Sequence, residues 1–143
     1  MAVRVKLRIR SRTSGEVAEV SALINTGFET ESPQLLMPVR LARQLSLYPP
    51  PPTSSVVEIG TAGGPARVFL VRDAVDVWAV AEDREVGPRP ADVLISPIEE
   101  EALVNDKLTE ELGIVLLAPG SGKWRFVDDP FDKVRGSERP QYW

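Results

Sequence analysis

The stretch Leu23-Ile24-Asn25-Thr26-Gly27-Phe28-Glu29 decides the fold, because an apolar run ends there and polar turn residues follow it. Residues 16–24 form a predicted strand that closes on Ala22-Leu23-Ile24. Asparagine tolerates unusual backbone angles and glycine prefers them, so Asn25-Thr26-Gly27 predicts a break in the strand. The sequence therefore predicts a strand that runs directly into a tight polar turn.

The segment before this strand alternates basic and apolar residues. The basic positions are Arg4, Lys6, Arg8, Arg10 and Arg12. Their spacing predicts a strand over residues 2–10 with one basic face, and Ser14-Gly15 predicts the turn of a hairpin. A basic face is compatible with a nucleic-acid partner, but no aromatic residue is interleaved to stack on a base. We therefore interpret it as a solvated strand face and expect no nucleic-acid ligand.

The segment after the turn continues with short strands. Leu35-Leu36-Met37 predicts a buried strand, and Pro38 is well suited to start the helix predicted over residues 39–45. Prolines 49–52 predict a stiff connector. Residues 54–59 and 66–81 predict two extended strands, so the glycine-rich residues 60–64 between them form the tip of a long hairpin.

The last third of the chain predicts a second strand–helix unit. Asp92-Val93-Leu94-Ile95 predicts a buried strand, and Ser96 with Pro97 and Glu99 has the pattern of a capping box. The predicted helix runs to about Leu112 and ends at Gly113. Residues 114–117 and 123–127 predict a final hairpin. Residues 128–143 are polar and predict a loosely attached tail, to which Tyr142 and Trp143 could add docking contacts.

The amino-acid composition excludes several classes of catalytic and metal-binding site. The chain of 143 residues has no cysteine and no histidine, which excludes disulfides, thiol catalysis, histidine-activated nucleophiles and most zinc sites. Acid–base chemistry would need carboxylates, lysine or tyrosine, and we expect no cofactor and no metal. No apolar run approaches the length of a membrane span and no signal peptide is apparent, so we expect a cytoplasmic protein without a membrane partner.

Taken in order, these features resemble the retropepsin-like aspartic proteases, in their single-domain, homodimeric, microbial form. The resemblance covers residues 3–127 and implies a mostly β fold, an acid-protease β-barrel with two short α-helices that pairs with a second copy. A domain of residues 1–127 would then carry the tail 128–143. In the family the turn reads Asp-Thr-Gly or Asp-Ser-Gly, and the long hairpin is a mobile flap.

The resemblance also assigns the site. It places Asn25, Thr26 and Gly27 at the catalytic turn. It places the ligand beside Phe28 and Glu29 of the turn and Thr61, Ala62, Gly63 and Gly64 of the flap. The ligand that it implies is a peptide or an unfolded protein segment, held in a cleft shared by the two copies.

The chain departs from the family at the residue that performs the hydrolysis. The family aspartate is Asn25 here, and an amide neither titrates near neutral pH nor takes a proton from water. A second departure is Ser96, where the family has a glycine after its second apolar triplet. Thr26 and Gly27 keep structural reasons to be present without catalysis. The resemblance together with Asn25 therefore implies a catalytically silent homodimer that binds a peptide.

Two further interpretations stay open. The chain is an active aspartic endopeptidase if Asn25 is an engineered change, or if another carboxylate such as Glu29 or Glu31 serves in its place. In the third interpretation it is a small β-barrel with a structural or nucleic-acid-associated role.

Overall fold

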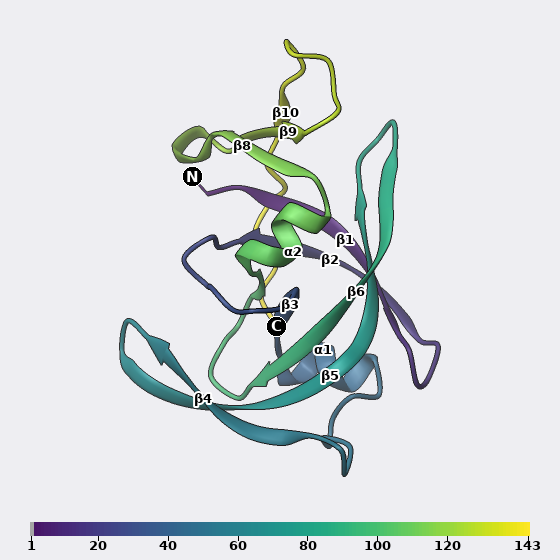
Figure 1. Cartoon of the computed structure of the whole chain (residues 1–143), viewed down its shortest axis with the longest axis vertical. Helices are drawn as coiled ribbons and strands as arrows, with labels where there is room; N and C mark the ends of the chain where they lie inside the picture. Colours follow the sequence, from purple (N-terminus) through teal and green to yellow (C-terminus); the bar gives the residue numbers. More distant parts are fainter. Residues whose placement is uncertain (1) are drawn as a thin grey trace.

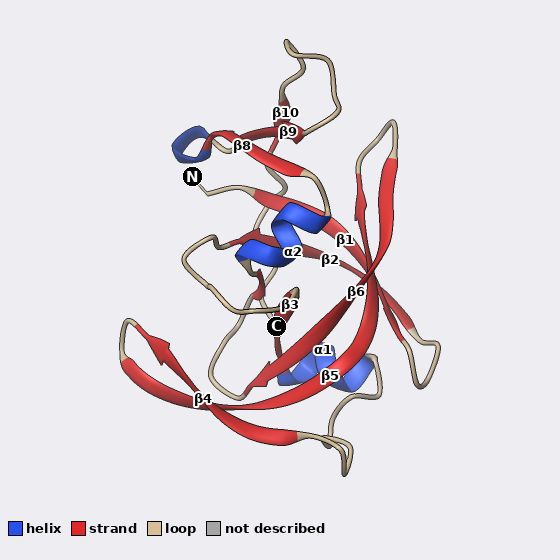
Figure 2. Cartoon of the chain, viewed as in Figure 1, coloured by secondary structure: helices blue, strands red, loops and turns tan. Residues whose placement is uncertain are grey.

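The computed structural model describes residues 2–143, and strands make up most of it (Figures 1 and 2). The strands are β1 (Arg4–Ser11), β2 (Val17–Ile24), β3 (Gln34–Pro38), β4 (Ser55–Thr61), β5 (Gly64–Val80), β6 (Glu85–Ser96), β7 (Ala102–Val104), β8 (Ile114–Ala118), β9 (Lys123–Phe126) and β10 (Arg135–Gly136). The helices are α1 (Val39–Gln44), α2 (Asp106–Glu111) and a 3-10 turn, η1 (Pro119–Ser121). The mostly β class with two short α-helices is thus confirmed.

The main sheet closes into a barrel. Its strands run in the order β1-β2-β7-β3-β6-β5-β4, and β1 pairs in addition with β5. This extra pairing closes the ring through β1, β2, β7, β3, β6 and β5, while β4 stays outside it as an edge strand. The long strand β5 therefore belongs to the barrel at one end and to the β4–β5 hairpin at the other.

The predicted hairpins follow the local sequence signals. In β1 the apolar positions Val5, Leu7 and Ile9 are fully buried, as the alternation predicts, and β2 pairs with this strand antiparallel. The β4–β5 and β8–β9 hairpins also form at their predicted turns. The helix α1 begins at Val39 as predicted, and Pro38, the last residue of β3, occupies the N-cap position rather than the first helical position.

The second helix begins later than its capping-box signal predicts. Ser96 ends β6, and its hydroxyl accepts hydrogen bonds from the N–H groups of Ile98 and Glu99 without a helix following. The chain instead forms β7, which pairs with both β2 and β3. The actual cap is Asn105, so the predicted helix start at residue 97 is wrong, whereas the end before Gly113 is confirmed. Two strand pairings for β7 outweigh a local helix signal.

The tail is ordered against the barrel, which corrects the prediction of loose attachment. β10 pairs with β9, and the N–H of Glu138 donates to the carbonyl of Arg4. The terminal Trp143 packs against the main core and donates its backbone N–H to the carbonyl of Glu100, while Tyr142 stays 65% exposed. Residues 135–143 are therefore attached to β9, β1 and β2, whereas the loop of residues 128–134 stays largely exposed.

Candidate functional site

The turn after β2 holds Asn25 in a defined orientation. The N–H of Asn25 donates to the carbonyl of Val104 in β7 at 3.0 Å, and the N–H of Phe28 donates to the carbonyl of Asn25 at 3.1 Å. The side-chain Oδ1 of Asn25 accepts from the N–H of Gly27 at 3.1 Å. The amide oxygen is therefore engaged by its own turn, an Asx-type arrangement that fixes the side chain locally.

A buried asparagine anchors the loop that follows this turn. Asn105, fully buried at the cap of α2, accepts from the N–H groups of Gln34 and Leu108, both at 2.9 Å. Its Nδ2 donates to Thr30 Oγ1 at 2.7 Å and to the carbonyl of Ser32 at 2.9 Å. One neutral side chain thus ties together the loop of residues 25–33, β3 and α2.

Sequence reasoning missed Asn105, although a signal for it was present. It follows the apolar residues Ala102-Leu103-Val104 and precedes Asp106, which is a normal helix start. The capping-box pattern at Ser96 instead predicted an earlier helix start, at residue 97. The N–H of Asp106 also donates to the carbonyl of Phe28 at 3.1 Å, so α2 begins directly against the turn.

A second anchor of the loop is the nearly buried carboxylate of Asp92 in β6. It accepts from Ser32 Oγ at 2.8 Å and from the N–H of Asp73 at 2.8 Å, with Arg72 Nη1 at 3.6 Å. Asp73 lies at the irregularity in β5 and has a positive φ of 47°. Asp92 therefore fixes the loop and the bend of β5 at the same time, a role that its predicted strand position did not reveal.

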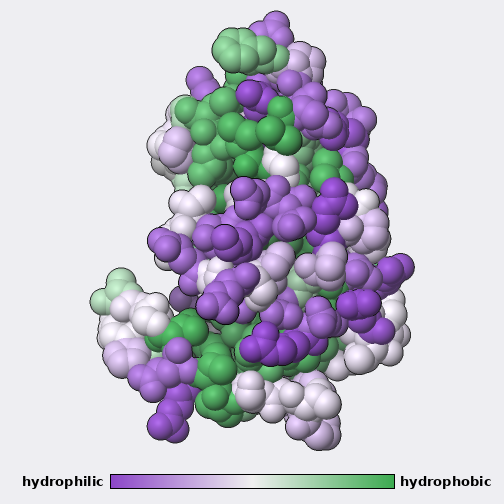
Figure 3. Space-filling model, viewed as in Figure 1, coloured by the Kyte–Doolittle hydropathy of each residue, from purple (hydrophilic) through white to green (hydrophobic). Residues whose placement is uncertain are grey.

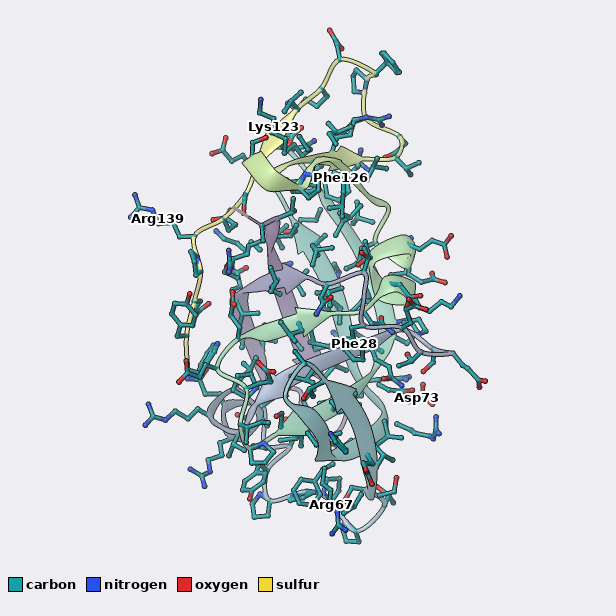
Figure 4. All side chains as sticks on the ribbon, turned by 90° about the vertical axis from the view of Figure 1, so that its left-hand side faces the viewer. Phe28, Arg67, Asp73, Lys123, Phe126 and Arg139 are labelled. Atoms are coloured by element: carbon teal, nitrogen blue, oxygen red, sulfur yellow. The ribbon has the colours of Figure 1, made fainter. Side chains whose placement is uncertain are left out.

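The β4–β5 hairpin reaches the same side of the molecule as this loop. A small apolar cluster, separate from the main core, joins them: buried Leu36, Val68, Leu70 and Leu94, with half-buried Phe28, Val57, Ile59 and Leu103 packed against it. Phe28 of the turn and Val57 and Ile59 of β4 are thus brought together. Figure 4 looks onto this side and shows Phe28 near its middle, above the β4–β5 hairpin.

The hairpin tip is exposed and locally bonded. Thr61, Ala62 and Gly63 are exposed, and Thr61 Oγ1 donates to the carbonyl of Gly64 at 2.5 Å. Gly64 has a φ of 106°, a backbone region that favours glycine. Within residues 2–143 no hydrogen bond joins this tip to the Asn25 turn. The structure therefore brings Phe28 to the hairpin strands but does not connect the tip with residues 25–27.

The residues of the predicted site that belong to the turn differ in their exposure to solvent. Thr26, Gly27 and Glu29 are exposed, whereas Asn25 and Phe28 are half-buried. Among the described residues no group of histidine, cysteine or acidic side chains is arranged to hold a metal ion. The chemistry available at the turn is therefore that of an amide, a hydroxyl and an apolar ring.

Two grooves of the molecule lie away from residues 25–27 of the turn. A groove of about 460 Å³ lies between β1, the β5–β6 turn and the tail, with Lys6, Glu82 and Lys133 among its lining residues. A smaller one of about 170 Å³ lies behind the loop, beside Ser32 and Asp92. Neither is lined by Asn25 or by the hairpin tip.

The largest electrostatic perturbations are found at the far end of the barrel. Asp129 pairs with Arg135 at 2.8 Å and with Arg84 at 3.3 Å, and its carboxylate also accepts from the N–H of Phe126. The hydrogen bond from Arg135 is the main reason why the pKa of Asp129 lies well below its usual range. Arg135 pairs also with Asp83, at 2.6 Å. In Figure 4 Phe126 marks this end, distant from Phe28.

The basic face of β1 is largely neutralised by acidic neighbours. Arg8 pairs with Glu85 at 2.8 Å, and Arg10 pairs with Asp76 at 3.0 Å. Arg4 is joined to Glu101 by a charge-assisted hydrogen bond. These ion pairs reduce the positive potential that a nucleic-acid ligand would need.

No helix within residues 2–143 is long and apolar enough to cross a membrane. No family model matches the chain, and no curated protein matches it. The fold and the site geometry are therefore the basis for a functional conclusion.

Proposed function

We propose that the chain is a catalytically silent, retropepsin-like homodimer that binds an extended peptide or an unfolded protein segment beside the β4–β5 hairpin. The observation that carries this proposal is the amide of Asn25 at the end of β2, with its Oδ1 engaged by the N–H of Gly27. Aspartic protease chemistry needs two carboxylates that share a proton. A pair of amides in that position supplies neither the base nor the acid.

The ligand class follows from the β4–β5 hairpin and the apolar cluster beneath it. β4 is an edge strand of the main sheet, so its outer backbone groups are open to pairing with an added strand. Its half-buried Val57 and Ile59 lie with Phe28 in one apolar cluster. Strand addition provides affinity through main-chain hydrogen bonds, and apolar surface beside the strand provides preference for apolar side chains.

The homodimer is part of the proposal because one copy offers only one side of a cleft. Thr26 and Gly27 are exposed at the turn. A second copy that faces this turn would enclose the ligand and bury more of its surface. If the purified protein is monomeric at micromolar concentration, this proposal fails.

The decisive experiment compares the chain with its Asn25→Asp variant on an unfolded protein substrate, from about pH 3 to about pH 7. We expect cleavage by the variant alone, because the substitution restores the shared carboxylate pair. The Asn25→Gln variant is the matched control, since it keeps an amide and should stay inactive. Cleavage by the unmodified chain would instead support the active endopeptidase. If the Asn25→Asp variant does not cleave the substrate, the resemblance to the family extends only to its fold.

Ligand binding is tested separately on two positions of the same strand. Ile59→Asp places a charge in the apolar cluster, whereas Val56→Asp places it on a side chain that is already 60% exposed. We expect Ile59→Asp to weaken binding of a fluorescent unfolded protein at least about tenfold, since a desolvated charge is costly. Val56→Asp should bind as the parent does. Equal binding by both variants would contradict a ligand at the inner side of β4.

A further inference from the structure

The two faces of the edge strand β4 differ in chemistry. Val57 and Ile59 are half-buried and pack against the small apolar cluster. The alternate positions Val56 and Glu58 are exposed on the opposite face. Figure 3 shows apolar and hydrophilic surface side by side where the β4–β5 hairpin lies, at the lower left. A segment that adds to the outer edge of β4 therefore meets apolar side chains on one face and a carboxylate on the other.

The side chain of Glu58 has no partner within residues 2–143. It is the one charged residue of β4, and no hydrogen bond or ion pair engages its carboxylate. Its register partner in β5 is Arg67, which is exposed and likewise unpaired. In Figure 4 Arg67 lies towards the lower end of the molecule, on this hairpin. The carboxylate of Glu58 is therefore available to a side chain that approaches along the outer edge of β4.

The turn that shares the apolar cluster with β4 is also acidic. Phe28 of this turn packs against the same cluster as Ile59. The segment of residues 25–33 carries Glu29 and Glu31, both exposed, and no basic residue. The turn and β4, which both contribute half-buried side chains to the cluster, therefore present only negative charges to a ligand beside them.

The basic side chain of Arg67 belongs to β5, one strand farther from the edge. Neighbouring strands are about 4.8 Å apart, so an added strand lies one spacing from the backbone of Glu58 and two spacings, about 10 Å, from that of Arg67. The Debye length is about 8 Å at physiological ionic strength. Repulsion of a basic ligand by Arg67 is therefore screened more strongly than its attraction by Glu58.

A charge on an edge strand also protects that edge, because it discourages pairing with other strands. Glu58 repels an acidic side chain placed opposite it, and its desolvation by an uncharged side chain is costly. A basic side chain in that position instead gains from the cross-strand pair. The same carboxylate thus rejects one class of strand and selects another, and specific interfaces commonly combine repulsion and attraction in this way.

We infer that the ligand of the β4 edge is an extended segment in which apolar and basic residues alternate, with a lysine or arginine opposite Glu58 and apolar side chains towards Val57 and Ile59. The inference rests on the proposed function for the place of binding, and it adds the chemical class of the ligand. Glu58 is thereby the residue that determines specificity, whereas the apolar cluster provides affinity by removing apolar surface from water.

The test uses two labelled peptides of alternating valine and serine that differ only at a central serine position, which is lysine in one peptide and glutamate in the other. The parent should bind the lysine peptide about fivefold more tightly, because a cross-strand pair of opposite charge replaces a pair of like charge. Glu58→Lys should reverse this preference, and Glu58→Gln should remove it. Fluorescence anisotropy titrations measure the dissociation constants.

Arg67→Gln is the matched control, because it also neutralises one exposed charge of the hairpin. It should keep the preference for the lysine peptide close to that of the parent, since the cation of β5 is screened from the added strand. If Arg67→Gln instead raises the preference by as much as Glu58→Gln lowers it, the net charge of the hairpin decides and the assignment to Glu58 is overturned. Circular dichroism confirms that each variant is folded.

The outcomes separate this inference from the proposed function. Reversal of the preference by Glu58→Lys supports the inference, and a preference that persists in Glu58→Gln overturns it. If the parent binds both peptides equally and Ile59→Asp weakens both, the ligand class is overturned while binding at β4 stands. The same holds if the parent binds neither peptide but binds an unfolded protein in a manner that Ile59→Asp weakens. If it binds neither the peptides nor an unfolded protein, the inference and the proposed function both fail.

Discussion

The loop after β2 and the loop after β9 are both polar, yet they are held by different chemistry. Residues 25–33 are fixed mainly by neutral hydrogen bonds from Asn105, whereas residues 127–134 are fixed by the ion pairs of Asp129. Arg84 and Arg135 also stack on the ring of Phe126 at 4.7 Å and 5.0 Å. Neutral anchors hold a loop independently of pH and salt, while buried ion pairs hold it only when both partners are charged.

This difference has a consequence for the candidate site. The turn at Asn25 carries an amide, and its nearest anchor is also an amide. The carboxylates of the loop, Glu29 and Glu31, are exposed rather than used as internal supports. The contacts of Asn25 and Asn105 are therefore neutral, and Asp92 at Ser32 is a carboxylate that anchors this loop, whereas the loop at the tail end is held by the ion pairs of Asp129.

The largest effect is expected where a buried charge loses its partner. Asp129→Asn should lower the free energy of unfolding by about 3 kcal/mol, because the side chain of Arg135, only 9% exposed, keeps its charge with one carboxylate fewer. Asp128→Asn is the matched control, since that side chain is 68% exposed, and its unfolding midpoint should be unchanged. Urea titrations measure both. Equal losses at the two positions would contradict the distinction between them.

The next largest effect compares the two asparagines that follow β2 and β7. Asn105→Ala should cost about 2 to 3 kcal/mol, because the cap of α2 is lost and buried backbone groups are left without partners. Asn25→Ala removes a single acceptor from a half-buried turn and should cost less than about 1 kcal/mol. Urea unfolding of both variants checks this order. The reverse order would mean that the turn, rather than α2, supports the loop.

A smaller effect is expected at the end of the tail. Trp143→Ala should cost about 1 to 2 kcal/mol, because the indole packs against the main core. Tyr142→Ala, at a side chain that is 65% exposed, should change stability by less than about 0.5 kcal/mol. Thermal unfolding of the two variants measures the difference. Similar melting temperatures for both variants and the parent would show that the terminus contributes no packing energy.

The smallest effect is the loss of folding stability at low pH that is caused by protonation of Asp129. The folded-state pKa of Asp129 is lowered by Arg135, so its contribution to stability is present above the unfolded pKa of about 4 and is lost as pH falls below it. The urea midpoint of the parent should therefore begin to fall below about pH 4. The Asp129→Asn variant should show a flatter profile over the same range. Parallel profiles would contradict the assignment of the acid response to Asp129.

Much of the fold was accessible from local sequence patterns. The alternation in residues 2–10 predicted the buried face of β1, and Ser14-Gly15 predicted the turn into β2. The glycines at 60–64 predicted the tip of the β4–β5 hairpin. In each case the two partner strands are close in sequence, so a turn signal and a strand period are sufficient to specify the pairing.

The candidate site was only partly accessible. The turn at residues 25–27 follows from its own residues. The role of Asn105 did not follow, because its partners Thr30 and Ser32 lie about 75 positions away in the chain. A hydrogen-bond partner that distant leaves no local pattern, so the sequence could not show which asparagine supports the loop.

The sequence by itself determined the strand faces, the tight turns and the presence of an amide at position 25, because these depend on near neighbours and on residue chemistry. The tertiary structure decided the closure of the barrel through the pairing of β1 with β5 and the formation of β7 in place of a helix start. It also decided the attachment of the tail, through Asp129 and Trp143. These features depend on contacts between segments far apart in the chain, whose formation requires the whole core to be assembled.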